Sequence, residues 1–168
     1  MATFQKILVP TDFSECSYAA SDMAAKLAVQ FGASVTLLHV DEPPAWQGFV
    51  IPELVVSLPN EANTSLHEFV QTRTRRALEH LTTQLRNAGV TQVEERLEVG
   101  EPDAVILRVA EQLRCDLIVI GTHGRKGFER LMIGSVAERV VRQSSCPVLT
   151  VQVPNQEKKA DSANTGGT

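Results

Sequence analysis

Runs of apolar residues alternate along this chain with stretches in which apolar residues recur every three or four positions. A short continuous apolar run predicts a buried strand, whereas the three-to-four spacing predicts a helix with one buried face. Strands are predicted at 6–10, 34–40, 93–99, 116–120 and 147–153. The helices predicted between them cover the residues up to Gly32, 61–88, the residues from Glu101 on, and 135–143.

The first helix illustrates the helical pattern. Its expected buried face consists of Ala20, Met23, Ala24, Leu27, Ala28 and Phe31. Gly32 follows directly, and glycine commonly ends a helix because it adopts the left-handed conformation without a steric cost. We therefore expect the helix to place this face on a sheet and to end at Gly32.

The alternation of strands and helices predicts the fold class. Strands that are joined through helices run parallel, and parallel sheets are covered by helices on both faces. We therefore expect an α/β fold with a five-stranded parallel sheet and helices on both faces. Residues 1–153 would form this domain, and 154–168, which are polar and without an apolar period, are expected to be a disordered tail.

Glycines mark the junction between the fourth predicted strand and the helix after it. The junction begins with Gly121-Thr122-His123-Gly124, continues for nine residues, and ends with Gly134-Ser135. A helix N-terminus exposes unpaired N–H groups and carries about half a positive charge, and glycines allow a ligand to approach the backbone closely. The junction therefore predicts a phosphate-binding loop.

A second segment is expected at the same edge of the sheet. Ligands of open parallel sheets bind outside the carboxyl ends of the strands, where the strand order reverses. The first strand ends in Pro10-Thr11-Asp12 and the fourth in the glycine loop. If these strands are neighbours, a nucleotide at the reversal would contact both.

Composition narrows the classes of partner. The net charge of −4 and the pI near 5.6 argue against a general nucleic-acid-binding protein. No apolar run reaches 18 residues and the N-terminus lacks the plan of a signal peptide, which argues against a membrane span and secretion. The three scattered cysteines fit a reducing compartment, so a cytoplasmic location is expected.

Catalysis has less support than binding. The chain contains no G-x-x-x-x-G-K-[ST] loop, no G-x-S-x-G turn and no acidic pair obviously placed to hold Mg²⁺. A Ser/His/Asp triad assembled by the fold stays open. Slow ATP hydrolysis is the most that these residues suggest.

At the glycine loop the chain resembles the nucleotide-binding type of the universal stress protein family. The loop pattern of that family is glycine, two residues, glycine, nine residues, glycine and a hydroxyl residue, as in Gly121, Gly124, Gly134 and Ser135. The resemblance extends over about 3–153. It is carried also by Ile7-Leu8-Val9-Pro10-Thr11-Asp12, Leu37-Leu38-His39-Val40, Gly100-Glu101-Pro102 and Cys146-Pro147-Val148.

The resemblance implies a Rossmann-like fold of the adenine nucleotide alpha hydrolase kind, with strand order 3-2-1-4-5, a homodimer, and ATP with Mg²⁺ or Mn²⁺ held through its phosphates. Pro10, Thr11 and Asp12 would border the base and ribose, and Val40 would meet adenine through its backbone. The residues implied at the phosphates are Gly121, Thr122, His123, Gly124, Arg125, Gly134, Ser135 and Val136. No catalytic residue and no metal ligand is implied.

Several of these residues have a structural alternative. Ser135 and Glu138 fit a capping box, in which case replacing Ser135 would cost helix stability, and Asp12 with Glu15 fits another. His39 is expected to face the core with its imidazole bonded locally. Arg125 is the best candidate for a side-chain contact to phosphate.

The sequence thus favours an ATP-binding stress-response regulator, in which occupancy of the site modulates how a homodimer meets a partner that is not identified. Two alternatives stay open, a nucleotide-using transferase or phosphatase and an interaction module without nucleotide. The dimer is expected to form through the apolar last strand, which would lie at a sheet edge. A proline at Val151 is expected to break that pairing.

Overall fold

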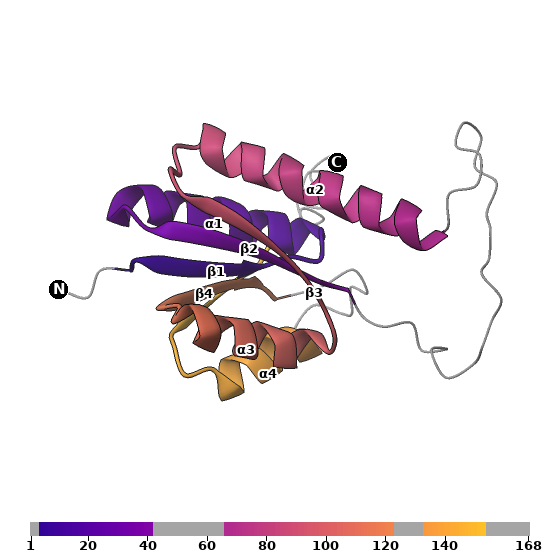
Figure 1. Ribbon diagram of the computed structural model, residues 1–168. Helices are drawn as coiled ribbons and strands as arrows, with labels where there is room; N and C mark the ends of the chain where they lie inside the picture. Colours follow the sequence, from indigo (N-terminus) through magenta and orange to yellow (C-terminus); the bar gives the residue numbers. More distant parts are fainter. Residues whose placement is uncertain (1–3, 42–65, 123–132, 154–168) are drawn as a thin grey trace, which may run out of the picture.

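The structure is a computed structural model that describes residues 4–41, 66–122 and 133–153, without the side chains of 66–71. Strands and helices alternate along the chain (Figure 1). The strands are β1 (Lys6–Pro10), β2 (Ser34–Asp41), β3 (Val93–Val99), β4 (Leu117–Gly121) and β5 (Val148–Val151). The helices are α1 (Glu15–Phe31), α2 (Leu66–Asn87), α3 (Pro102–Leu113) and α4 (Ser135–Gln143).

The sheet has the order β3-β2-β1-β4-β5, and all its neighbouring strands are parallel. Figure 1 shows α1 and α2 on one face of the sheet and α3 and α4 on the other. The expected α/β class, the parallel sheet with two covered faces, and the 3-2-1-4-5 order are therefore confirmed.

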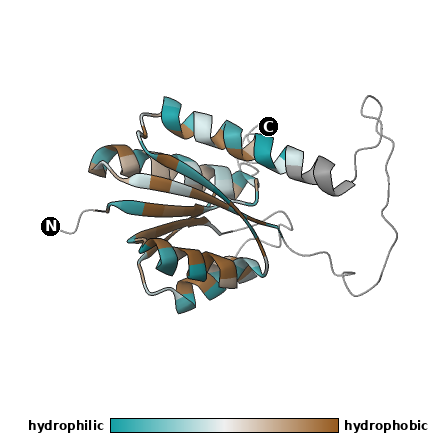
Figure 2. Ribbon diagram, viewed as in Figure 1, coloured by the Kyte–Doolittle hydropathy of each residue, from teal (hydrophilic) through white to brown (hydrophobic). Residues whose placement is uncertain are grey.

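Successive side chains of a strand point to opposite faces, and this divides the core in two. Ile7 and Val9 of β1 pack with α1 and α2, whereas Leu8 between them packs with α3 and α4. In Figure 2 the hydrophobic colour runs along the central strands and the sides of the helices that meet them. Each face of the sheet thus has its own apolar layer.

The buried face of α1 differs in part from the expectation. Ala20, Ala24 and Ala28 are buried as expected, but Met23 and Phe31 are each 37% exposed. Ser17 and Ser21 are buried in their place. Their hydroxyls donate to the carbonyl oxygens of Ser14 and Ser17, at 2.9 and 3.0 Å, so burial leaves neither hydroxyl unpaired. Small side chains on this face let α1 approach the sheet closely.

The ends of the predicted elements agree to within a few residues. Gly32 ends α1 in the left-handed conformation, with φ of 68°, as expected. The last strand is shorter than the predicted 147–153, at Val148–Val151. The first residues of the helix predicted at 61–88, and the polar tail at 154–168, lie outside the described residues.

Among the described helices, none combines the length and the apolar character that a membrane crossing requires.

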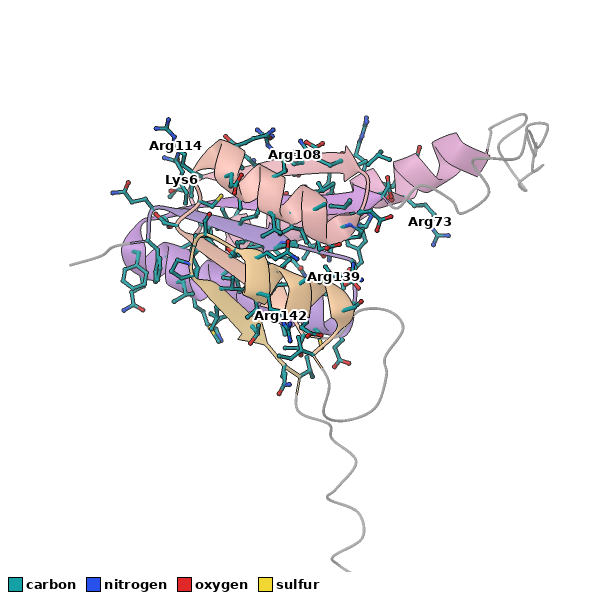
Figure 3. The ribbon with its side chains drawn as sticks, turned by 90° about the horizontal axis from the view of Figure 1, so that it is seen from below. Lys6, Arg73, Arg108, Arg114, Arg139 and Arg142 are labelled. Atoms are coloured by element: carbon teal, nitrogen blue, oxygen red, sulfur yellow. The ribbon has the colours of Figure 1, made fainter. Side chains whose placement is uncertain are left out.

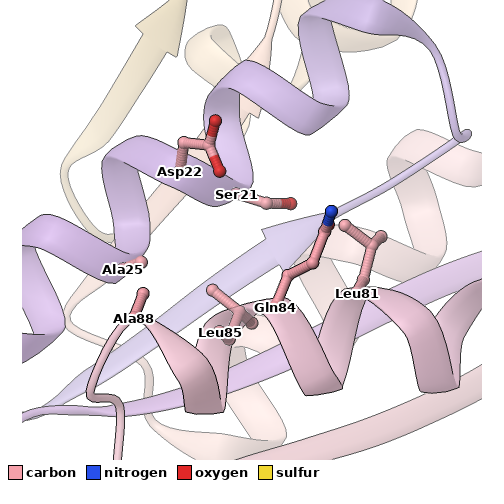
Figure 4. A pocket seen from close by; sticks show the side chains of 7 residues that line it. All are labelled: Ser21, Asp22, Ala25, Leu81, Gln84, Leu85 and Ala88. Atoms are coloured by element: carbon pink, nitrogen blue, oxygen red, sulfur yellow. The ribbon is translucent and has the colours of Figure 1, made fainter.

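A small hollow lies between α1 and α2 (Figure 4). It is lined by Ser21, Asp22, Ala25, Leu81, Gln84, Leu85 and Ala88, and its volume is only about 20 Å³. Sites for small molecules usually measure about 300–1,000 Å³. The hollow is therefore an irregularity in helix packing.

Cys115 joins the core where the chain passes from α3 to β4. Burial raises the pKa of the Cys115 thiol to about 11, and the nearby Cys146 and Asp116 add to this increase. The raised pKa means that the neutral thiol is favoured, and only the thiolate is a good nucleophile. Cys115 is thus a packing residue.

We predict that iodoacetamide at pH 8 alkylates Cys115 more slowly than the partly exposed Cys16 and Cys146. With a pKa of about 11, only about one Cys115 thiol in a thousand is ionised at pH 8. Mass spectrometry of peptides taken over time measures the three rates, and the difference should disappear in denaturant. Equal rates in the folded protein would contradict the burial of Cys115.

Candidate functional site

The candidate site lies at the carboxyl ends of β1 and β4, the two strands between which the strand order reverses. Leu8 of β1 is paired with Ile118 of β4. Extended at the same offset, this register brings Thr11 level with Gly121. The expected neighbourhood of the first and fourth strands is thus confirmed, and the segments that follow them meet at one edge of the sheet.

Thr11 anchors the turn between β1 and α1. Its side chain is buried, and its backbone N–H donates to the carbonyl oxygen of Leu38 on β2 at 2.8 Å. Its hydroxyl oxygen accepts from the N–H of Phe13 at 3.1 Å and lies 3.1 Å from the hydroxyl of Ser17. The Thr11 hydroxyl is therefore engaged within the protein.

Asp12 does not cap α1 as a capping box would require. Ser14 is the N-cap, and its hydroxyl oxygen accepts from the N–H of Ser17 at 3.3 Å. Instead, Oδ1 of Asp12 accepts a hydrogen bond from the N–H of Ser14 at 3.0 Å, which closes an Asx turn. The capping interpretation of Asp12 was wrong because the helix begins two residues later. Phe13, between the two, has the left-handed φ of 61°.

The backbone of Val40 lies at the edge of the sheet where the candidate site is expected. The N–H of Thr11 reaches the carbonyl oxygen of Leu38, so Leu38 directs its backbone groups toward β1. Backbone direction alternates along a strand, and Val40 therefore directs its N–H and C=O to the same side. β1 ends at Pro10, so these groups point past the end of the strand. Val40 itself is partly exposed.

Gly121 allows two backbones to approach each other. A Cβ added there would lie 2.7 Å from the carbonyl carbon of Cys16 and 2.8 Å from its oxygen. No side chain fits at such distances, so α1 lies against the end of β4 only because residue 121 is glycine. Gly121 therefore permits the close approach of α1, whereas from the sequence the loop glycines were expected to permit the approach of a ligand.

Thr122 and Gly134 join the two ends of the glycine loop. Thr122 is buried, and its N–H and hydroxyl donate to the carbonyl oxygen of Val151 on β5, at 2.9 and 3.3 Å. The carbonyl oxygen of Thr122 accepts the N–H of Gly134 at 2.6 Å. These bonds place the start of α4 beside the end of β4.

Ser135 is the first residue of α4 and not its cap. Gly134 is the N-cap, and among the described residues no side-chain hydrogen bond caps this helix. The capping-box interpretation of Ser135 and Glu138 was therefore wrong, because the Thr122 bond moves the start of the helix to Gly134. Ser135 is exposed, and Val136 packs partly against the core below α4. The N-terminus of α4 thus meets the site without a side-chain cap.

Arginines on α3 and α4 form ion pairs. Arg139 lies 3.3 Å from Asp103, and Arg108 lies 3.2 Å from Glu98. Figure 3 shows these arginines on α4 and α3, with Arg142 further along α4. Arg142 pairs with Glu138 one turn earlier, at 3.2 Å. Their charges are compensated within the fold.

Three predicted phosphate contacts, His123, Gly124 and Arg125, lie outside the described residues. Within the described ranges, no three His, Cys, Asp or Glu side chains gather as metal ligands. Phe13, Ser14 and His39 contact the turn between β1 and α1 at the candidate site, but they were not assigned to the site from sequence. Ser14 carries a hydroxyl suited to an N-cap, and this was the available signal for the helix start.

The fold defines a doubly wound α/β protein, a class in which ligands bind outside the carboxyl ends of the strands where the strand order reverses, here between β1 and β4. The model of the universal stress protein family matches residues 3–152, so the chain belongs to that family. Universal stress protein MJ0531 from Methanocaldococcus jannaschii is 36% identical over 155 residues, which cover 92% of this chain and 85% of that protein.

Solved structures share the fold. The structure of MJ0577, from the same archaeon, superposes with a TM-score of 0.73 at 27% identity and covers 92% of this chain and 99% of that one. A universal stress protein crystallised in complex with cAMP has a TM-score of 0.67 at 24% identity, covering 90% of this chain and 98% of its own.

Gly121→Ala is predicted to lower the free energy of unfolding by about 1–3 kcal/mol, the usual cost of overpacking. The added methyl group meets backbone atoms of Cys16, which cannot rotate away. Urea unfolding followed by circular dichroism measures the loss. The loss should persist in a Cys16→Ala background, because the obstacle is the main chain. Rescue by Cys16→Ala would show that the thiol was the obstacle instead.

Proposed function

We propose that this protein is a regulator that binds ATP in the crevice between the carboxyl ends of β1 and β4, and that occupancy of the crevice modulates how a homodimer meets its partner. The observation that carries the proposal is the N-terminus of α4. It opens beside the end of β4, with a glycine N-cap and, within the part of the chain that the structure describes, no side-chain cap.

This N-terminus has the chemistry of a phosphate site. The first N–H groups of a helix lack intrahelical partners, and the helix dipole adds partial positive charge there. Ser135 contributes an exposed hydroxyl at the first helical position. Together with the N–H groups of Ser135 and Val136, this hydroxyl would bind phosphate oxygens.

The other end of the crevice suits adenine. Val40 directs a backbone donor and a backbone acceptor past the end of β1. The Watson–Crick edge of adenine presents an acceptor at N1 and a donor at the 6-amino group, which would pair with those two groups. The fold also accommodates an adenine nucleotide in a relative, since one universal stress protein was crystallised with cAMP.

The remaining site residues complete the proposal. Pro10, Thr11 and Asp12 would border the ribose, Thr11 through its backbone because its hydroxyl is engaged in the turn. Gly121 and Thr122 would hold the start of the phosphate-binding loop at the end of β4. His123, Gly124 and Arg125 would join Gly134 around the phosphates. Mg²⁺ or Mn²⁺ would be held through the phosphates of ATP.

The proposed regulator acts as a homodimer in the cytoplasm. All three cysteines are free thiols, which supports a reducing compartment. β5 is an edge strand of the sheet, and an edge invites pairing with a second copy. In a twofold dimer two β5 strands would pair antiparallel, and no open edge would remain there.

The hydrogen bonds of β5 identify which residues would make this pairing. The carbonyl oxygen of Pro147 accepts from the N–H of Ile118 on β4 at 3.0 Å, and that of Val151 accepts from the N–H of Thr122, directly after β4, at 2.9 Å. Odd-numbered residues of β5 therefore face β4, and Thr150 directs its N–H to the open edge. Val151 directs its backbone groups to β4, so a proline there would disturb β5 within its own sheet, and Thr150 is the position that tests the pairing with a second copy.

Ser135→Ala is predicted to weaken ATP binding at least about tenfold, since a hydrogen bond to a charged group contributes about 1.5–3 kcal/mol. The free energy of unfolding should stay the same or rise slightly, because Ser135 is not a cap and alanine favours helix. Titration calorimetry and urea unfolding measure the two quantities.

Ser135→Thr is the matched control, because it keeps the hydroxyl and should keep most of the affinity. Wild-type affinity in Ser135→Ala would remove the hydroxyl from the site. No binding of ATP by the wild-type protein at millimolar concentration would reject the proposed function itself.

Thr150→Pro is predicted to convert a dimer into a folded monomer. Proline removes the N–H that Thr150 offers to a second copy and spares the bonds between β5 and β4. Sedimentation velocity at matched micromolar concentrations measures the state of assembly, and circular dichroism checks the fold.

Thr150→Val keeps the N–H and the branched side chain, and it should remain dimeric. A monomeric wild-type protein would refute dimerisation. A folded Thr150→Pro protein that stays dimeric would place the interface elsewhere.

A further inference from the structure

His39 lies on β2 directly before Val40, and its side chain is buried, as was expected from the sequence. Nδ1 of the ring lies 2.7 Å from the carbonyl oxygen of Thr11. A carbonyl oxygen only accepts hydrogen bonds, so Nδ1 carries the hydrogen and donates it. This bond links β2 to the first residue after β1, across one side of the crevice.

Two further contacts hold the imidazole ring. Nε2 lies 3.3 Å from Oδ1 of Asp41, an ion pair when the ring is protonated. The ring of Phe13 lies against the imidazole, with 4.6 Å between ring centroids and 30° between planes. The ring is thus held by a backbone oxygen and an aromatic face, and also by the carboxylate of Asp41 when the ring is protonated. It touches two of the four residues that connect β1 to α1.

Phe13 is the residue of that turn that most needs support. Its φ of 61° is a left-handed conformation, which is rare for a bulky side chain and persists only where the surroundings enforce it. Its N–H is bonded to the hydroxyl oxygen of Thr11, and its ring rests on His39. Asp12 lies between Thr11 and Phe13, so its position depends on two neighbours that His39 contacts directly.

We propose that His39 is a positioning residue for the nucleotide crevice. It fixes the carbonyl of Thr11 and supports Phe13, and in this way it holds Asp12 and the start of α1 where they receive the ribose. His39 acts through these residues and does not touch the nucleotide. This inference rests on the proposed nucleotide function, because the affinity for ATP is one of its readouts.

The test compares three substitutions that separate the ring's hydrogen bonds from its volume. His39→Asn places an amide N–H near the position of Nδ1 and keeps the bond to Thr11. His39→Gln places its amide near Nε2, on the side of Asp41, and loses that bond. His39→Leu keeps a side chain of similar volume but loses the contacts of the ring nitrogens with Thr11 and Asp41.

Titration calorimetry with ATP should show that His39→Leu and His39→Gln weaken binding about tenfold or more, whereas His39→Asn stays within about threefold of the wild type. Rescue by asparagine and not by glutamine is the outcome that a general structural role would not produce. Equal losses in the asparagine and glutamine variants, or wild-type affinity in the glutamine variant, would overturn the proposal. The asparagine and glutamine pair decides the matter if His39→Leu fails to fold.

A nuclear magnetic resonance measurement on the free protein does not depend on ATP. Long-range ¹⁵N–¹H spectra should show a proton on Nδ1 of His39, and the amide signals of Phe13 and Ser14 should shift in His39→Gln but stay close to the wild type in His39→Asn. An unprotonated Nδ1 would overturn the proposal. If these signals behave as expected but the wild-type protein binds no ATP, the proposed function fails while the positioning contact stands.

Discussion

The candidate site depends on how closely the first turn of α1 approaches the end of β4. Gly121 permits that approach, because any side chain there would collide with the backbone of Cys16. Ser17 continues it, because its side chain is small and buried and its hydroxyl bonds the carbonyl oxygen of Ser14. The same closeness brings Ser17 to the hydroxyl of Thr11 and fixes the turn after β1. The shape of the site therefore follows from backbone packing.

The elements of the fold could be predicted because apolar periodicity reports directly which faces are buried. The strand order came from the resemblance to a family, since periodicity does not say which strands are neighbours. The face of α1 was predicted incorrectly at Met23 and Phe31. A hydropathy pattern counts serine as polar, whereas a serine that bonds its own helix can be buried without an unpaired hydroxyl.

The site was harder to predict than the fold. Asp12 and Ser135 both fit capping boxes, but tertiary contacts decided where each helix begins. The left-handed Phe13 moves the cap of α1 to Ser14, and the bond to Thr122 makes Gly134 the cap of α4. It was predictable that the buried imidazole of His39 would have a hydrogen-bond partner within the protein, but the identity of that partner was not. The carbonyl of Thr11 is distant in sequence and becomes a neighbour only once β1 and β2 pair.

The bond between the carbonyl oxygen of Thr122 and the N–H of Gly134 has an evolutionary consequence. It joins the end of β4 to the start of α4 directly, so the contact that holds these two elements together lies outside the segment between them. Doubling the length of a closed loop costs only about 0.6 kcal/mol. Insertions and exchanges between Thr122 and Gly134 would thus leave the rest of the molecule folded. Under the proposed function, selection could revise ligand preference there without rebuilding the core.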